Sequence, residues 1–113
     1  MARNKYGARK VVVDGLKFDS QREATRWQEL KQLARAGEIT GLVRQVVFEL
    51  APAVKLHGEA RKKPALRYVA DFRYVTTPDF AYVVEDAKGR DTPVSRIKRH
   101  LMKSVHGIDV VIS

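Results

Sequence analysis

The sequence contains no cysteine, and no apolar run in it approaches the length of a membrane-spanning helix. The absence of cysteine excludes disulfides and thiolate metal sites, and it fits a reducing compartment. The absence of a long apolar run argues against a membrane protein. Residues 1–10 are polar and basic, without the apolar segment of a signal peptide. We therefore expect a cytoplasmic protein with no membrane partner.

Two other absences limit the chemistry. The three histidines, His57, His100 and His106, do not have the spacing of zinc ligands, and we expect them at the surface or at helix ends. No glycine-rich phosphate loop is present, which argues against nucleotide hydrolysis. We therefore expect neither a zinc site nor nucleotide hydrolysis.

Acidic residues are scarce: 13 Asp and Glu stand against 22 Lys and Arg, a net charge of +9. Such an excess indicates a polyanionic partner, and nucleic acid is the usual one. We find no base-reading motif, which favours recognition of DNA shape over a specific sequence. The residues that we predict to contact DNA phosphates are Arg61, Lys62, Lys63, Arg90, Arg96, Lys98, Arg99 and Lys103.

The length of 113 residues predicts a single domain, residues 1–113, with a modest core. Residues 1–9 are typical of a flexible basic arm. The stretch KVVVDGLKF then predicts a β-hairpin, with Asp14 and Gly15 as its two-residue turn.

A first helix is indicated by Ser20, which lies three residues before Glu23 in a capping-box spacing, and by Gly37 at its end. Trp27 and Leu30 continue a helical stripe that begins at Glu23. A glutamate on that stripe faces the sheet, whereas a capping residue has no need to lie there. We favour Glu23 pointing toward a site on the sheet, with capping as the rival explanation.

Three strands and a second helix are expected next, followed by a last strand, IDVVIS. The strands are residues 44–50, ALRYVADFRYV and FAYVVEDAK, and residues 51–65 between the first two predict a long loop or a ragged hairpin. The second helix begins at Asp91 or Thr92, with Ile97, Leu101 and Val105 on its buried face. This order predicts an α/β domain with a mixed central β-sheet flanked by helices and an N-terminal β-hairpin.

Two acids fall on neighbouring predicted strands. If the connecting loop is Pro78-Asp79, Asp71 lies directly opposite Asp86, and if the loop begins at Thr76, the two acids are diagonal. Either even-length loop places both on one face, whereas an odd loop separates them. Asp79 is a rival to Asp71 but has turn chemistry.

Asp86 and Lys88 alternate onto one face, away from Glu85, which we expect against a helix or bound to a basic side chain. Two neighbouring carboxylates repel, and a hard cation such as Mg²⁺ or Mn²⁺ removes the conflict. Lys88 then assists an attacking water or stabilises the developing charge. The alternative is a surface cluster of salt bridges, which contributes little.

These residues resemble the PD-(D/E)xK nuclease superfamily, whose signature is an acid on one strand and acid-x-Lys on the next. Here these are Asp71 and Asp86-Ala87-Lys88. The closer resemblance is to small phage-encoded endonucleases, including the phage endonuclease I group of Holliday-junction resolvases. FDSQRE matches their F-x-S-x-x-E helix start, so their additional metal-site acid corresponds to Glu23. The residue before Asp71 is Ala70 rather than proline.

The resemblance covers roughly residues 16–112 and implies a restriction-endonuclease-like core and hydrolysis by a water that metal ions activate. The implied catalytic residues are Glu23, Asp71, Asp86 and Lys88, and the implied metal ligands are Glu23, Asp71, Asp86 and Ala87. It also implies a homodimer, which no residue pattern indicates directly, and a bacterial or phage-infected host cell.

We therefore predict a Mg²⁺-dependent DNA endonuclease, in which Mn²⁺ can substitute, acting on branched or junction DNA. The first alternative is a non-catalytic basic domain that binds nucleic acid on the same scaffold. The second is a sequence-specific restriction or nicking enzyme of the same superfamily.

Overall fold

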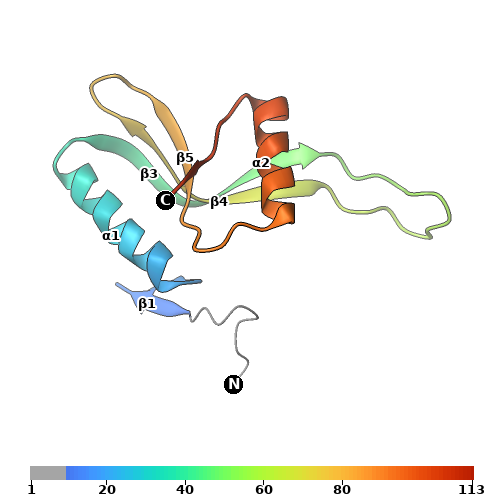
Figure 1. The fold of residues 1–113 in the computed structure, drawn as a ribbon, viewed down its shortest axis with the longest axis horizontal. Coiled ribbons are helices and arrows are strands. Elements are labelled where there is room, and N and C mark those ends of the chain that lie inside the picture. Colours follow the sequence, from blue (N-terminus) through green and yellow to red (C-terminus); the bar gives the residue numbers. More distant parts are fainter. Residues whose placement is uncertain (1–9) are drawn as a thin grey trace.

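The computed structural model of the protein describes residues 10–113, so the basic arm expected at residues 1–9 lies outside the described residues. The elements are β1 (Val11–Val13), β2 (Leu16–Phe18), α1 (Gln21–Arg35), β3 (Ile39–Ala51), β4 (Leu66–Thr76), β5 (Tyr82–Asp86), α2 (Pro93–His106) and β6 (Val111–Ile112). The fold is mixed α/β, with a four-stranded sheet, a separate two-stranded hairpin and two helices (Figure 1). The predicted fold class is confirmed.

The local signals for the hairpin and the first helix are confirmed. Asp14 and Gly15 both have positive φ values, 51° and 76°, as a two-residue hairpin turn requires. The hydroxyl of Ser20 accepts the backbone N–H of Glu23 at 3.1 Å, which begins α1. Gly37, with φ 77°, follows the end of the helix.

The main sheet has the strand order β3-β4-β5-β6. The first three strands run antiparallel, and β6 joins β5 in parallel after the crossover through α2. Val84 packs in a cluster with Met102 of α2, whereas its neighbour Val83 packs beside Leu30 of α1. Because successive residues of a strand point to opposite faces, the two helices cover opposite faces of the sheet.

The side-chain alternation of β4 changes face at Asp71. Tyr68 and Ala70 pack in the α2 cluster, but Phe72 and Tyr74 pack in the α1 cluster, although all four have the same parity. On β3, the residue beside this point is Gln45, with φ 55°. Two neighbouring strands are therefore irregular at the position where the site acids lie.

The structure corrects two sequence predictions. The strand expected at residues 44–50 is longer and spans Ile39–Ala51. The α2 stripe predicted to be buried is not: Ile97 is 61% exposed, Val105 is 51% exposed, and Leu101 is half-buried. Met102 is the buried residue of α2, because the helix rests on the sheet through the adjacent side. A four-residue spacing defines a stripe but does not say which side of the helix meets the sheet.

The ragged hairpin expected between the strands is present. Residues 52–65 form a projecting connection with one isolated β-bridge between Val54 and Lys63. Among residues 10–113, no helix is both long and apolar enough to cross a membrane.

Candidate active site

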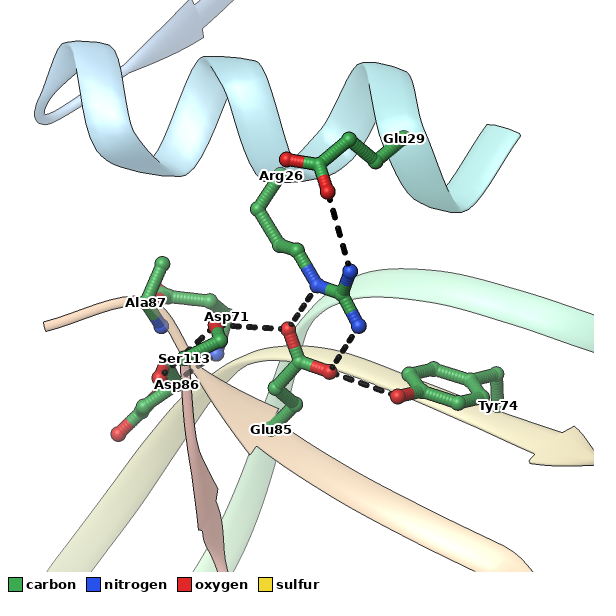
Figure 2. A network of polar contacts seen from close by, with 8 residues as sticks. All are labelled: Arg26, Glu29, Asp71, Tyr74, Glu85, Asp86, Ala87 and Ser113. Carbon is green, nitrogen blue, oxygen red and sulfur yellow. Dashed lines mark hydrogen bonds and ion pairs between the residues drawn. The ribbon is translucent and has the colours of Figure 1, made fainter. Parts of the chain in front are cut away.

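The two strand acids lie side by side at the end of β5. The register pairs Phe72 with Glu85 and Val75 with Tyr82, which is the first of the two expected registers and places Asp71 opposite Asp86. The backbone N–H of Asp71 donates to Oδ1 of Asp86 at 2.8 Å, and Oδ2 of Asp71 accepts the N–H of Ala87 at 2.9 Å. Figure 2 shows the three residues grouped at this strand end. These two backbone N–H groups thus donate to carboxylate oxygens, in place of the backbone carbonyls that accept such bonds in a regular sheet.

The carboxylate of Asp86 is buried and held by protein donors on both oxygens. The hydroxyl of Tyr68 donates to Oδ2, and Lys88 Nζ lies 3.4 Å from the same oxygen. The N–H of Asp71 occupies Oδ1. The predicted pair of Asp86 and Lys88 is therefore in contact, as an ion pair whose lysine is more exposed than its acid.

Glu23 reaches the same region from the first turn of α1. It is 3% exposed, and its carboxylate accepts hydrogen bonds from the backbone N–H of Asp19 at 3.4 Å and from Nε2 of Gln45 at 3.2 Å. A guanidinium nitrogen of Arg44 lies 3.9 Å away. The side chain of Glu23 therefore contacts the chain just before the helix start, and it also faces the irregular part of the sheet through Gln45.

Electrostatics link Glu23 to Asp71. Burial, followed by the negative charge of Asp71, raises the pKa of Glu23 to about 7. Burial also raises the pKa of Asp71, although the N–H of Ala87 and the charge of Lys88 oppose the change. Asp19, which the sequence reading missed, adds negative charge beside both acids. Burial is therefore the main cause of both raised pKa values, and the charge of Asp71 adds to it at Glu23.

Glu23 and Asp71 are the two acids of this region that could hold a cation. Within residues 10–113, no group of three or more acidic or histidine side chains is placed to hold a metal ion. Mg²⁺, however, is commonly bound through one or two carboxylates, with waters and substrate phosphates completing its shell. Both acids have carboxylate oxygens and raised pKa values, which a bound cation would lower. Asp86 can join them only by exchanging hydrogen bonds that it makes to the protein.

Glu85 and Asp79, the two rival acids, have other partners. Glu85 is fully buried and accepts hydrogen bonds from Arg26 at 2.6 and 3.1 Å, from Tyr74 at 2.6 Å and from Ser113 at 2.8 Å (Figure 2). This confirms the expectation that it binds a basic side chain. Asp79 accepts a hydrogen bond from Thr76 at 2.7 Å within the β4–β5 turn.

The Glu85 network fixes the strand end behind the acids. Burial alone would raise the pKa of Glu85, but the hydrogen bonds from Arg26, Tyr74 and Ser113 lower it below its usual value. Burial and the contact with Glu85 raise the pKa of Tyr74 to about 12. The backbone of Ser113 also pairs with Asp86 and Lys88, at 2.9 and 3.2 Å. Sequence reasoning missed Arg26, Tyr74 and Ser113 as supports, because only the tertiary fold brings them together.

The predicted phosphate-binding residues occupy three places. Arg61, Lys62 and Lys63 are exposed on the β3–β4 connection, and Arg90 is exposed between β5 and α2. On α2 the predicted residues are Arg96, Lys98, Arg99 and Lys103. Three of these four pair with acids: Arg96 and Arg99 lie 3.6 and 2.6 Å from Asp91, and Lys103 lies 2.7 Å from Asp109. The α2 cluster is therefore more neutralised than its sequence suggests.

Comparison with curated proteins and with solved structures gives no match. A family model described as "Protein of unknown function (DUF1064)" matches residues 3–109, so the chain belongs to this family.

Proposed function

We propose that the protein is a metal-dependent DNA endonuclease that hydrolyses phosphodiester bonds, with branched or junction DNA as its preferred substrate. One observation carries the proposal: Glu23, which is buried, and Asp71, which is half-buried, lie beside the ion pair of Asp86 and Lys88 in a chain of net charge +9. The raised pKa values of Glu23 and Asp71 indicate a cost for ionising both acids, and a bound cation would remove it. The basic surface supplies attraction for a polyanion.

Each residue has a defined task in this proposal. A bound Mg²⁺, or Mn²⁺ in its place, supplies stabilisation of phosphoryl charge and an acidified water. Glu23 and Asp71 would hold the ion, and the N–H of Ala87 orients the Asp71 carboxylate. Lys88, whose ammonium group lies beside Asp86 and reaches solvent, would hold the attacking water or stabilise negative charge at the phosphate.

The proposal is tested with labelled four-way junction, nicked duplex and linear duplex DNA, each with Mg²⁺ or with EDTA. We expect cutting of the junction with Mg²⁺, none with EDTA, and at least a hundredfold loss in Asp71→Asn. Asp79→Asn is the matched control, because it makes the same change in the turn, where Asp79 contacts only Thr76 among the hydrogen bonds described. Equal loss in both variants would contradict the assignment of the site.

One observation favours a second candidate function, a non-catalytic DNA-binding domain. Both Asp86 oxygens already accept hydrogen bonds from the protein, as they would in a purely structural role. Tight junction binding without cutting, with Mg²⁺ and with Mn²⁺, would establish this alternative. Cutting confined to one linear sequence would instead indicate a restriction or nicking enzyme.

A further inference from the structure

The β3–β4 connection, residues 52–65, projects from the body of the protein as an arm. Figure 1 shows it extending to the right, along the longest axis of the described residues, which measures 55 Å. Beyond the ends of the two strands, Val54 and Lys63 exchange two backbone hydrogen bonds, of 3.1 and 2.6 Å. Nearly every residue of the arm is exposed. A two-stranded hairpin without a core is marginally stable alone, so we expect contact with a partner to stabilise the arm.

The arm combines cations with exposed apolar side chains. It contains Lys55, Arg61, Lys62 and Lys63 against a single acid, Glu59, which lies 3.3 Å from Lys63. On the same arm, Val54 is 47% exposed and Leu56 is 50% exposed. Cations alone would suit any polyanion, and apolar residues alone would suit a protein. The combination suits DNA, whose minor groove accepts apolar side chains between two rows of phosphates.

The distance from the site matches the dimensions of a duplex. Leu66, at the base of the arm, and Asp71 lie on the same strand, about 17 Å apart at ~3.3 Å per residue. Lys63, at the β-bridge of the arm, is eight residues from Asp71, about 26 Å at the same rise. The arm therefore begins roughly half a turn of B-DNA from the acids and reaches its bridge at roughly three quarters of a turn, one turn being about 34 Å.

We propose that the arm binds the duplex segment that leads away from the cleaved phosphate, with its apolar side chains at the minor groove and its cations on the flanking phosphates. This rests on the proposed nuclease function and names its substrate more closely: the cut lies beside a duplex of about one turn. The segment is read by charge and groove shape, because the arm holds no pattern that pairs with base edges.

Binding without cutting tests the arm directly. The double variant Arg61→Gln, Lys62→Gln is compared with Lys31→Gln, Arg35→Gln, which removes two cations from the C-terminal half of α1, one of them paired with Asp14. Fluorescence anisotropy in EDTA measures affinity for a duplex across a range of salt. We expect the arm variant to bind duplex about tenfold more weakly, and the control to bind with little change. The slope of log affinity against log salt concentration should be smaller for the arm variant by about two phosphate contacts. Equal losses in both variants would overturn the proposal.

The apolar contribution is tested by Val54→Ser, Leu56→Ser. Both positions are half-exposed, so the fold does not depend on them. We expect several-fold weaker binding to duplex, an unchanged salt slope and unchanged binding to single-stranded DNA of the same sequence. An effect on sedimentation with none on DNA affinity would overturn the proposal in favour of contact between two copies of the chain.

Cutting then separates the arm from the site. The wild type should cut junctions with duplex arms of about twenty base pairs far faster than those with arms of about six, and the Arg61, Lys62 variant should lose that difference. If the wild type cuts no substrate but the arm variants bind duplex more weakly than the wild type does, the nuclease proposal fails. The proposal that the arm binds duplex then stands. If cutting occurs and the arm variants show the wild-type length dependence, the arm proposal alone fails.

Discussion

The replacement Glu23→Gln should stabilise the protein above neutral pH when no divalent cation is present. Glu23 is buried against the sheet and near Asp71, and these causes raise its pKa from 4.5 to about 7. The folded state therefore holds a proton on Glu23 more tightly than the unfolded chain does. The stability linked to that proton is complete below pH 4.5, falls as the pH rises toward 7, and is absent above pH 7.

The magnitude follows from the two pKa values. At about 1.4 kcal/mol per pKa unit, the change from 4.5 to about 7 corresponds to about 3 kcal/mol at alkaline pH. Glutamine keeps a hydrogen-bonding oxygen for Gln45 but loses the attraction to Arg44, which lies 3.9 Å from the carboxylate. We therefore expect a net gain of about 2 kcal/mol at pH 8 and almost none at pH 4.

Urea unfolding at pH 4, 6 and 8 in EDTA measures this difference, with Glu29→Gln as the control because Glu29 is exposed on the same helix. Adding Mg²⁺ at pH 8 should then raise the unfolding midpoint of the wild type and leave that of Glu23→Gln nearly unchanged. A variant that is less stable than the wild type at pH 8, or a difference that does not vary with pH, would refute the reasoning. Equal stabilisation of both proteins by Mg²⁺ would refute only the metal site.

Three further predictions concern stability. Glu85→Gln should lower the free energy of unfolding by about 3 kcal/mol near pH 7, because it leaves the Arg26 charge without its buried partner. Urea titrations should show that this loss becomes smaller at acid pH, as the pH approaches the lowered pKa of Glu85. Phe80→Gly should stabilise by about 1 kcal/mol in thermal unfolding, because Phe80 is 74% exposed and has φ 57°, which glycine adopts without strain. Met102→Ala should cost about 3 kcal/mol, whereas Ile97→Ala should change the free energy of unfolding by under about 0.5 kcal/mol.

The sequence predicted the features that depend on local chemistry. The Asp14-Gly15 turn and the Ser20 cap each depend on only a few neighbouring residues, and the structure has both. The β4–β5 register also followed, because one of the two even-length turns allowed the observed pairing of Phe72 with Glu85. These predictions needed only turn conformations, capping and strand parity.

The features that the sequence did not predict depend on contacts between distant elements. Ile97 recurs with helical spacing, but the side of α2 that meets the sheet is decided by the crossover to β6. Arg26 and Glu85 are 59 residues apart, so their pairing requires the finished fold. Gln45 has φ 55° without being glycine, and no propensity rule indicates that conformation there.

The irregularity beside Gln45 explains why this sheet can hold a group of acids at all. In a regular ladder the backbone N–H groups of Asp71 and Ala87 would meet backbone acceptors or solvent, whereas here each meets a carboxylate of the neighbouring strand. Those donors, with Tyr68 and Lys88, stabilise the charge of Asp86 and part of the charge of Asp71. Glu23 projects from α1, and its pKa is raised to about 7. In the proposed nuclease, a cation from solution would lower the raised pKa values of Glu23 and Asp71.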